Sequence, residues 1–169
     1  MVTIRRVHTV SESDIDGLAE VLFDVVEGGA SVSFMQPFTR DRASAFWRKV
    51  ADGVTTGTRA LLVAEDEQGI CGTVQLVYDL PENQPHRADL AKMLVHRRAR
   101  RRGIGDALLK AAERTAKELG KTVLVLDTAS ADAERLYERN GWVRLGTIPD
   151  YALLPAGGYC DTIVFYRQL

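Results

Sequence analysis

Up to residue 95, apolar residues recur at helical spacing in two segments and at strand spacing in four. Between residues 15 and 26 they return every three or four positions, which predicts a helix that follows Ser11 and ends at Gly28 and Gly29. A second, weaker helical pattern covers 41–52. Strands are predicted at 4–7, 59–65, 70–78 and 88–95, and the turn at 66–69 joins the middle two as a hairpin.

The strand predicted at 88–95 changes phase along its length. Its apolar positions are even at Ala88 and Leu90 but odd at Met93 and Val95. A β-bulge, which inserts one extra residue into a strand, produces such a change. We therefore expect a bulge between Leu90 and Met93.

The second half of the chain alternates helices with strands. The strongest helical pattern covers 104–119, and a shorter one covers 131–139 and ends at Asn140 and Gly141. Strands are predicted at 122–126, 142–148 and 162–166. This order of elements predicts a mixed α+β fold, a sheet with helices on its faces.

Length and composition fit one compact domain, residues 1–169. The 169 residues are 46% hydrophobic and 27% charged, with a formal net charge of -1. A net charge this close to zero provides no overall attraction to nucleic acid or to an anionic membrane. No apolar stretch approaches the roughly 20 residues of a bilayer span, and the first residues lack the apolar centre of a secretory signal. We therefore expect a cytoplasmic protein.

The histidines and cysteines are scattered along the chain. His8, His86 and His96 lie on separate predicted elements without the spacing of metal ligands, so no metal site is expected. Cys71 and Cys160 form no paired motif, so no disulfide is expected and both are interpreted as packing residues.

A basic loop with two glycines, His96–Gly105, leads from a predicted strand into the strongest helix. Unpaired N–H groups at a helix N-terminus attract anions, glycine lets an anion approach the backbone, and arginine suits phosphate oxygens. Two common phosphate motifs do not match: a P-loop requires Lys-Ser or Lys-Thr where Asp106-Ala107 stands, and a dinucleotide fingerprint requires glycine where Leu108 stands. A solvated basic turn and a nucleic-acid patch are the alternatives; the Gly-x-Gly start of the helix favours phosphate.

Two segments resemble signatures of the GCN5-related N-acetyltransferases (GNAT). Arg100-x-x-Gly103-x-Gly105 resembles the family's Gln/Arg-x-x-Gly-x-Gly/Ala loop, which in that family binds the pyrophosphate of acetyl-coenzyme A. Ala133 to Trp142 resembles the second signature, Ala-x-x-Leu-Tyr-x-x-x-Gly-Phe. Both occur in order and at the usual spacing. The resemblance implies a GNAT-like, mostly antiparallel sheet of six to seven strands flanked by about four helices.

Within the family, the chain is most similar to the tabtoxin-resistance acetyltransferases. The similar stretches are 28–32, 87–89, 126–128 and 148–151. Two residues depart from the family pattern: Ser130 stands where many relatives have Asn, and Trp142 replaces the usual Phe. The subgroup implies a small amino-acid-like or toxin-like acceptor, and the family implies a homodimer.

The resemblance also implies the site residues. Backbone N–H groups near Leu94 or Val95 would face the developing oxyanion, and Tyr137 would be the general acid for the departing thiolate. The connection after Gly28 would wall the acceptor site, and it is more apolar than a plain surface loop requires. The predicted cofactor-binding residues are Met93, Leu94, Val95, Arg100, Arg101, Arg102, Gly103, Ile104, Gly105, Asp106, Ser130 and Tyr137, and the predicted acceptor-binding residues are Ser31, Phe34 and Met35.

Acetyl transfer to an amine requires a base, because an alkylamine with a pKa of about 10 is neutral in about one molecule in a thousand at pH 7. Asp89, on the strand before the loop, and Asp127, at the end of the next strand, are the candidates, and the strand end favours Asp127. The alternative is a structural carboxylate, which for Asp89 means a pair with Arg87. Proton transfer from Tyr137 to a thiolate is uphill by roughly 2 kcal/mol, so this residue should help without being indispensable; its alternative role is core packing.

Several functions are consistent with these residues. The leading hypothesis is an acetyl-coenzyme A-dependent N-acetyltransferase in which a small amine attacks the thioester directly. A protein N-terminal or lysine acetyltransferase is the alternative enzyme. Tyr137 and the two aspartates disfavour a non-catalytic acetyl-coenzyme A-binding module. The net charge and the lack of interleaved aromatic residues disfavour a nucleic-acid-binding domain.

Overall fold

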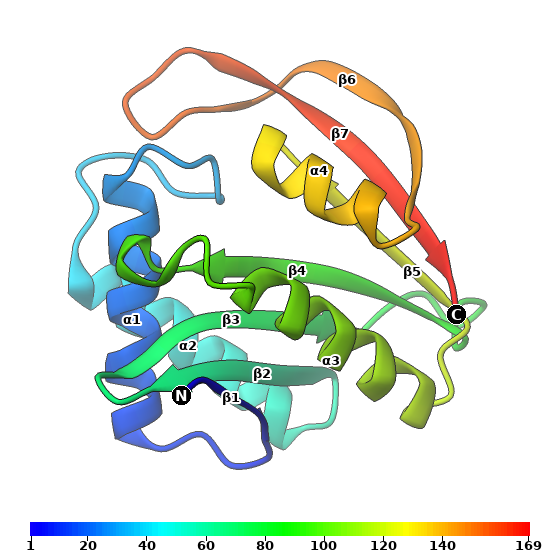
Figure 1. Cartoon of the computed structure of the whole chain (residues 1–169), viewed down its shortest axis with the longest axis horizontal. Helices are drawn as coiled ribbons and strands as arrows, with labels where there is room; N and C mark the ends of the chain where they lie inside the picture. Colours follow the sequence, from blue (N-terminus) through cyan, green and yellow to red (C-terminus); the bar gives the residue numbers. More distant parts are fainter.

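The computed structural model describes residues 1–169 and contains one seven-stranded sheet with helices on both faces (Figure 1). The strand order is β1-β2-β3-β4-β5-β7-β6, and every neighbouring pair is antiparallel except β4 and β5. The predicted α+β class and the predicted numbers of strands and helices are confirmed. No helix has the length and apolar composition needed to cross a membrane. The elements are β1 (Thr3–Val7), α1 (Glu12–Glu27), α2 (Arg40–Thr55), β2 (Arg59–Asp66), β3 (Gly69–Val77), β4 (Arg87–Val95), the 3-10 helix η1 (Arg97–Ala99), α3 (Ile104–Glu118), β5 (Val123–Thr128), α4 (Ala131–Arg139), β6 (Val143–Leu153) and β7 (Tyr159–Gln168).

The sheet is buried between two apolar clusters. One cluster lies under α3 and α4, and the other under α1 and α2. Strand β2 shows the division: Ala60, Leu62 and Ala64 belong to the first cluster, whereas Leu61 and Val63 belong to the second. A strand that is buried on both faces reads as a continuous apolar run, and this explains the unbroken pattern at 60–64.

Strand β4 contains the predicted bulge. Thr73 of β3 pairs with Leu94, whereas Gln75 pairs with Ala91, so β4 has one more residue than β3 between these pairs. Within the bulge Lys92 has a φ of +51°. The apolar residues before and after it pack against the same cluster, as the phase change predicts.

The last two strands are longer than the sequence predicted. Strand β6 continues to Leu153 instead of ending at Ile148, although its register shifts between Ile148 and Ala152. Asp150 has a φ of +50° there. Because β6 is an exposed outer strand, it has no alternation of buried and exposed residues from which its length could be predicted.

The sheet divides between β4 and β5. These strands pair only from Arg87–Asp89 to Val123–Val125, although β4 continues to Val95 and β5 to Thr128. Beyond Asp89 the facing edges have no strand partner, so backbone groups there are free to bind something else. This opening points toward the loop that precedes α3 and toward the connection between α1 and α2 (Figure 1).

Candidate active site

The loop before α3 has a backbone that only glycine adopts easily at one position. Gly103 caps α3 with a φ of +74°, and a Cβ added to it would meet no atom within 4 Å. Its requirement for glycine is therefore conformational. Gly105 differs, because a Cβ there would lie 3.2 Å from Leu136 Cδ2. The absent side chain of Gly105 makes room for α4 as well as exposing the backbone.

The same loop presents unpaired donors. None of the backbone N–H groups from Arg101 to Asp106 donates a hydrogen bond within the chain, and the first that does belongs to Ala107. Arg101 has a φ of +60° and makes no side-chain hydrogen bond, and Arg100 Nε donates only a long bond of 3.3 Å to the Val95 carbonyl oxygen. Free N–H groups, a helix N-terminus and two available guanidinium groups fit a phosphate or pyrophosphate group.

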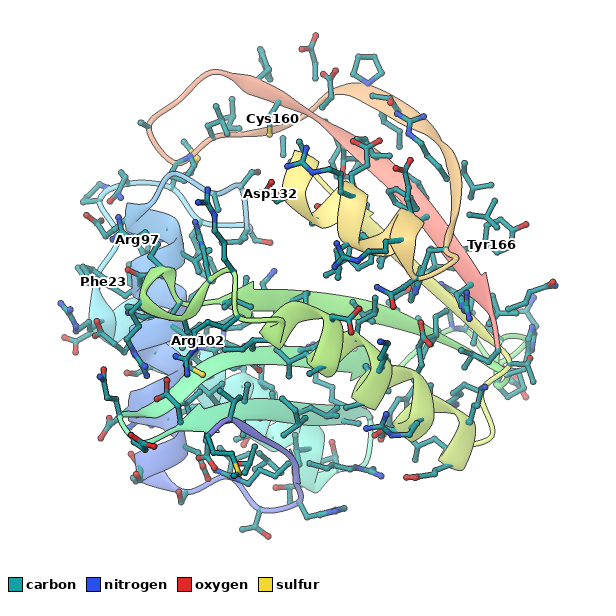
Figure 2. All side chains as sticks on the ribbon, viewed as in Figure 1. Phe23, Arg97, Arg102, Asp132, Cys160 and Tyr166 are labelled. Carbon is teal, nitrogen blue, oxygen red and sulfur yellow. The ribbon has the colours of Figure 1, made fainter.

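Not every residue predicted for this site is free. Arg102 turns toward the β2–β3 turn, where Asp66 accepts bonds of 3.0 Å from Arg102 and 2.7 Å from Arg98 (Figure 2). The hydrogen bond from Arg98, followed by those from the Gln68 N–H and from Arg102, lowers the pKa of Asp66 to about 2. Arg102 and Arg98 therefore fix the outer side of the loop.

Two further predicted cofactor residues have structural partners. Asp106 accepts a bond of 2.9 Å from Asn140 Nδ2 and pairs with Lys110 at 2.7 Å, which joins the start of α3 to the end of α4. Ser130 is the N-cap of α4, and its hydroxyl accepts a bond from the Ala133 N–H. These contacts hold α3 and α4 in place beside the opening.

The opening runs past the bulge and Tyr137. Met93, Leu94 and Val95 follow the bulge on the part of β4 that β5 does not pair with. Tyr137 is 3% exposed, and its ring lies 5.6 Å from the rings of Trp142 and Phe165. Its surroundings are those of a core residue, so the packing role is present in the structure.

The Tyr137 hydroxyl nevertheless remains available for chemistry. It makes no hydrogen bond within the chain, yet the buried side-chain polar atoms without a partner are only Trp47 Nε1, Gln75 Nε2 and Arg167 Nε. The hydroxyl oxygen therefore keeps contact with solvent. Burial, and secondarily the charge of Asp127, raises the pKa of Tyr137 well above its ordinary value. The phenol is consequently protonated across the physiological pH range.

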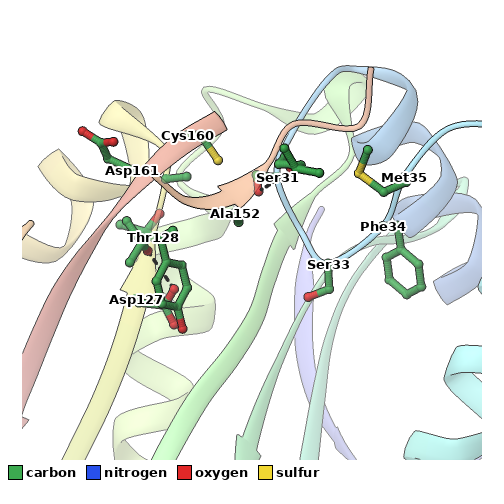
Figure 3. A pocket seen from close by; sticks show the side chains of 13 residues that line it. Ser31, Ser33, Phe34, Met35, Asp127, Thr128, Ala152, Cys160 and Asp161 are labelled. Atoms are coloured by element: carbon green, nitrogen blue, oxygen red, sulfur yellow. Dashed lines mark hydrogen bonds between the residues drawn. The ribbon is translucent and has the colours of Figure 1, made fainter. Parts of the chain in front are cut away.

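A pocket of about 350 Å³ lies between the α1–α2 connection and the β6–β7 hairpin (Figure 3). Ser31 Oγ donates a bond of 3.3 Å to the Leu153 carbonyl oxygen, and the Gln36 N–H donates one of 2.9 Å to the Pro155 carbonyl oxygen. These two bonds join the α1–α2 connection to the β6–β7 hairpin. Its lining contains the three predicted acceptor residues; the full set is Ser31, Ser33, Phe34, Met35, Asp127, Thr128, Ala129, Tyr151, Ala152, Leu153, Cys160, Asp161 and Thr162.

The structure brings only one of the two candidate bases to this pocket. Asp127 lines it and accepts a bond of 2.7 Å from the Thr162 hydroxyl. Asp89 does not line it and forms an ion pair with Arg87, which is the alternative that the sequence left open. A second carboxylate on the pocket wall, Asp161, accepts a bond of 3.0 Å from the Asp150 N–H.

Lys92 is a site residue that the sequence analysis missed. Its Nζ donates a bond of 2.9 Å to the hydroxyl of Ser33, which lines the pocket. Burial lowers the pKa of Lys92, and the negative charge of Asp127 opposes the lowering. A lysine in the otherwise apolar segment Leu90–Leu94, at the predicted bulge, was the signal that could have identified it.

Comparison with known proteins supports the sequence resemblance. A family model described as an acetyltransferase (GNAT) domain matches residues 57–144. Similar solved structures include a protein described as an acetyltransferase from Salmonella typhimurium with its cofactor acetyl-CoA, at 19% identity and a TM-score of 0.81, covering 100% of this chain and 94% of that one. A ribosomal-protein-alanine N-acetyltransferase from Brucella melitensis has 24% identity and a TM-score of 0.81, covering 99% of each chain. A protein described as a phosphinothricin N-acetyltransferase has 22% identity and a TM-score of 0.76, covering 100% and 99%.

Proposed function

The chain belongs to the acetyltransferase (GNAT) family, and we propose that it transfers the acetyl group of acetyl-coenzyme A to the amine of a small molecule. One juxtaposition carries this proposal: the loop of free N–H groups and the pocket that contains Asp127 border the same opening of the sheet, and Tyr137 lies near enough to Asp127 for that charge to raise its pKa. The opening supplies space for a long donor, and the pocket supplies space for a separate acceptor.

The donor would be held mainly by the backbone. The N–H groups of 101–106, with Arg100 and Arg101, would bind its pyrophosphate, and the unpaired edge of β4 at Met93–Val95 would lie along the rest of it. When bound, acetyl-coenzyme A supplies an activated thioester carbonyl. Free N–H groups near Leu94 or Val95 would stabilise the negative charge that develops on its oxygen.

The side chains divide the proton transfers. Asp127 would accept a proton from the acceptor amine, and the hydrogen bond from Thr162 keeps its carboxylate facing the pocket wall. Tyr137 would donate a proton to the departing sulfur, because its raised pKa keeps the phenol protonated. Attack of the neutral amine forms the C–N bond, and the C–S bond breaks. The proton lost by the amine goes to Asp127, and the proton lost by Tyr137 goes to the departing sulfur.

The bonds between the α1–α2 connection and the β6–β7 hairpin favour a small acceptor over a protein. A polypeptide acceptor requires a continuous groove, whereas the bonds from Ser31 to Leu153 and from Gln36 to Pro155 join these two segments. Acetylation of a protein N-terminus or lysine is therefore the less favoured alternative. Membership of the tabtoxin-resistance subgroup, a homodimer and a cytoplasmic location remain predictions.

A screen of amines tests the proposal. Purified protein is incubated with acetyl-coenzyme A and each of a panel of small amines, amino acids and short peptides, and free thiol is measured. We expect thiol release that depends on at least one small amine and that falls strongly in Asp127→Asn. Acetyl-coenzyme A binding without amine-dependent release would instead identify a non-catalytic binding module.

A further inference from the structure

Lys92 is a lysine without a carboxylate partner at the edge of the pocket. Its Nζ donates to the Ser33 hydroxyl at 2.9 Å and lies 5.7 Å from the centre of the Phe46 ring, and it forms no salt bridge. An ammonium group has three donors, and a hydroxyl satisfies only one of them. Lys92 therefore has two N–H donors without a partner in the chain, and no carboxylate contacts it directly.

The backbone at this contact is unusual on both sides. Ser33 has a φ of +83° and Lys92 a φ of +51°, and the chain has only two other non-glycine residues with positive φ, Arg101 and Asp150. Such conformations cost free energy and are concentrated at functional sites. Their presence in both partners of one hydrogen bond argues that the position of the Lys92 ammonium is important beyond packing.

The pocket separates positive from negative charge. Ser33, which holds Lys92, lies on the wall formed by the α1–α2 connection, whereas Asp127 and Asp161 lie on the wall formed by β5 and β7 (Figure 3). A plain amine would leave Lys92 without an anion in direct contact. An acceptor with an ammonium or amine at one end and an oxyanion at the other would match both walls.

We propose that Lys92 binds an oxyanion of the acceptor, a carboxylate or a phosphonate, and so selects amino-acid-like acceptors over plain amines. The inference rests on the proposed acetyl transfer and assigns a specificity-determining role to Lys92. The Ser33 hydroxyl orients the ammonium, whose remaining N–H groups bind the oxyanion. Asp127, on the opposite wall, faces the acceptor's amine end and repels its oxyanion, which fixes the direction in which the acceptor lies.

Matched acceptors test this assignment. Methionine, leucine and phenylalanine are each compared with the corresponding decarboxylated amine and with the corresponding aminophosphonic acid, with free thiol as the readout. The wild-type protein should favour the amino acids or the aminophosphonic acids over the amines, and whichever acid series is preferred identifies the oxyanion. Lys92→Gln should raise KM for the acids about 10- to 100-fold, the loss expected for a hydrogen bond to a charged group, with little change in KM for the amines.

Control variants separate the role of the charge from the role of the fold. Lys121→Gln is the matched control, since Lys121 Nζ also donates to a neutral oxygen, that of Pro85 at 2.8 Å, and lies 5.0 Å from a Tyr78 ring centre. It should leave the acid preference unchanged. Lys92→Arg should keep the preference, and Lys92→Asn, which tolerates a positive φ, replaces Lys92→Gln if that variant does not fold.

Three results distinguish failure of this inference from failure of the proposed function. An equal loss toward acids and amines in Lys92→Gln would overturn the inference, as would a wild-type preference for the plain amines. Binding of acetyl-coenzyme A without turnover of any compound in the panel would refute the proposed function, and the inference with it.

Discussion

Replacement of Tyr137 by phenylalanine separates its chemical role from its packing role. The substitution keeps the ring between Trp142 and Phe165 and removes a hydroxyl that makes no hydrogen bond within the chain. Nothing in the fold therefore loses a partner. We expect the free energy of unfolding to change by less than about 0.5 kcal/mol and the affinity for acetyl-coenzyme A to be almost unchanged.

The effect on turnover follows from the pKa values. An ordinary phenol with a pKa of about 10 already donates uphill to a thiolate of pKa about 8.5, and burial of Tyr137 raises its pKa further. A more uphill transfer makes a weaker general acid, and a thiolate leaves readily even without protonation. General acid catalysis contributes about 10²–10⁴-fold, so we expect the lower end, a fall in kcat of roughly 10²-fold.

The assay is single-turnover acetyl transfer, so that chemistry and not product release limits the measured rate. Tyr166→Phe is the matched control: Tyr166 also makes no side-chain hydrogen bond and lies toward the far end of β7 from the pocket residue Cys160 (Figure 2). It should retain the wild-type rate. An unchanged single-turnover rate in Tyr137→Phe would reduce Tyr137 to a packing residue, and a large loss of stability would show that its hydroxyl is structural.

Three further predictions follow from the site. Gly103→Ala and Gly57→Ala both place alanine at a φ of +74°, and neither added Cβ meets an atom within 4 Å. Thermal unfolding should show a loss of about 1–2 kcal/mol of stability in both variants. Calorimetry should show weaker acetyl-coenzyme A binding only in Gly103→Ala. Asp127→Asn should lower kcat about 10²-fold, whereas Asp89→Asn should have little effect; the reverse order would make Asp89 the base. The pKa of Asp66 is lowered from 3.8 to about 2. The carboxylate therefore stabilises the fold above about pH 4, and this contribution is lost as the pH falls from about 4 to 2. The difference in melting temperature between wild type and Asp66→Asn should disappear over that range.

The fold could be predicted in detail where one face of each element is buried. Helix α1 begins after Ser11 and ends before Gly28 as predicted, because the capping serine and the apolar stripe both have structural causes. The bulge in β4 was predictable because the strand on both sides of it packs against the same cluster. The length of β6 was not, since an exposed edge strand has no buried face to impose a pattern.

The parts of the site that depend on backbone conformation were predictable. The hydrogen-bond partners of its side chains were less so. The conformation of Gly103 follows from the residue type, and the pocket lining of Phe34 follows from its apolar character in a loop. Sequence could not show that Arg102 pairs with Asp66, because Asp66 lies on a distant hairpin that only the folded sheet brings near. It missed Lys92 for the same reason: its partner, Ser33, is 59 residues away along the chain.

The short parallel contact between β4 and β5 also has a mechanical consequence. Three residue pairs, from Arg87–Val123 to Asp89–Val125, connect the β1–β4 portion of the sheet to the β5–β7 portion. A junction this narrow resists bending less than a full-length strand pair does, so we expect the sheet to bend most readily there. A molecule bound in the opening would contact both portions of the sheet and would therefore restrict bending at this junction. Departure of the products would restore the flexibility, so each catalytic cycle would alternate between a stiff and a compliant sheet.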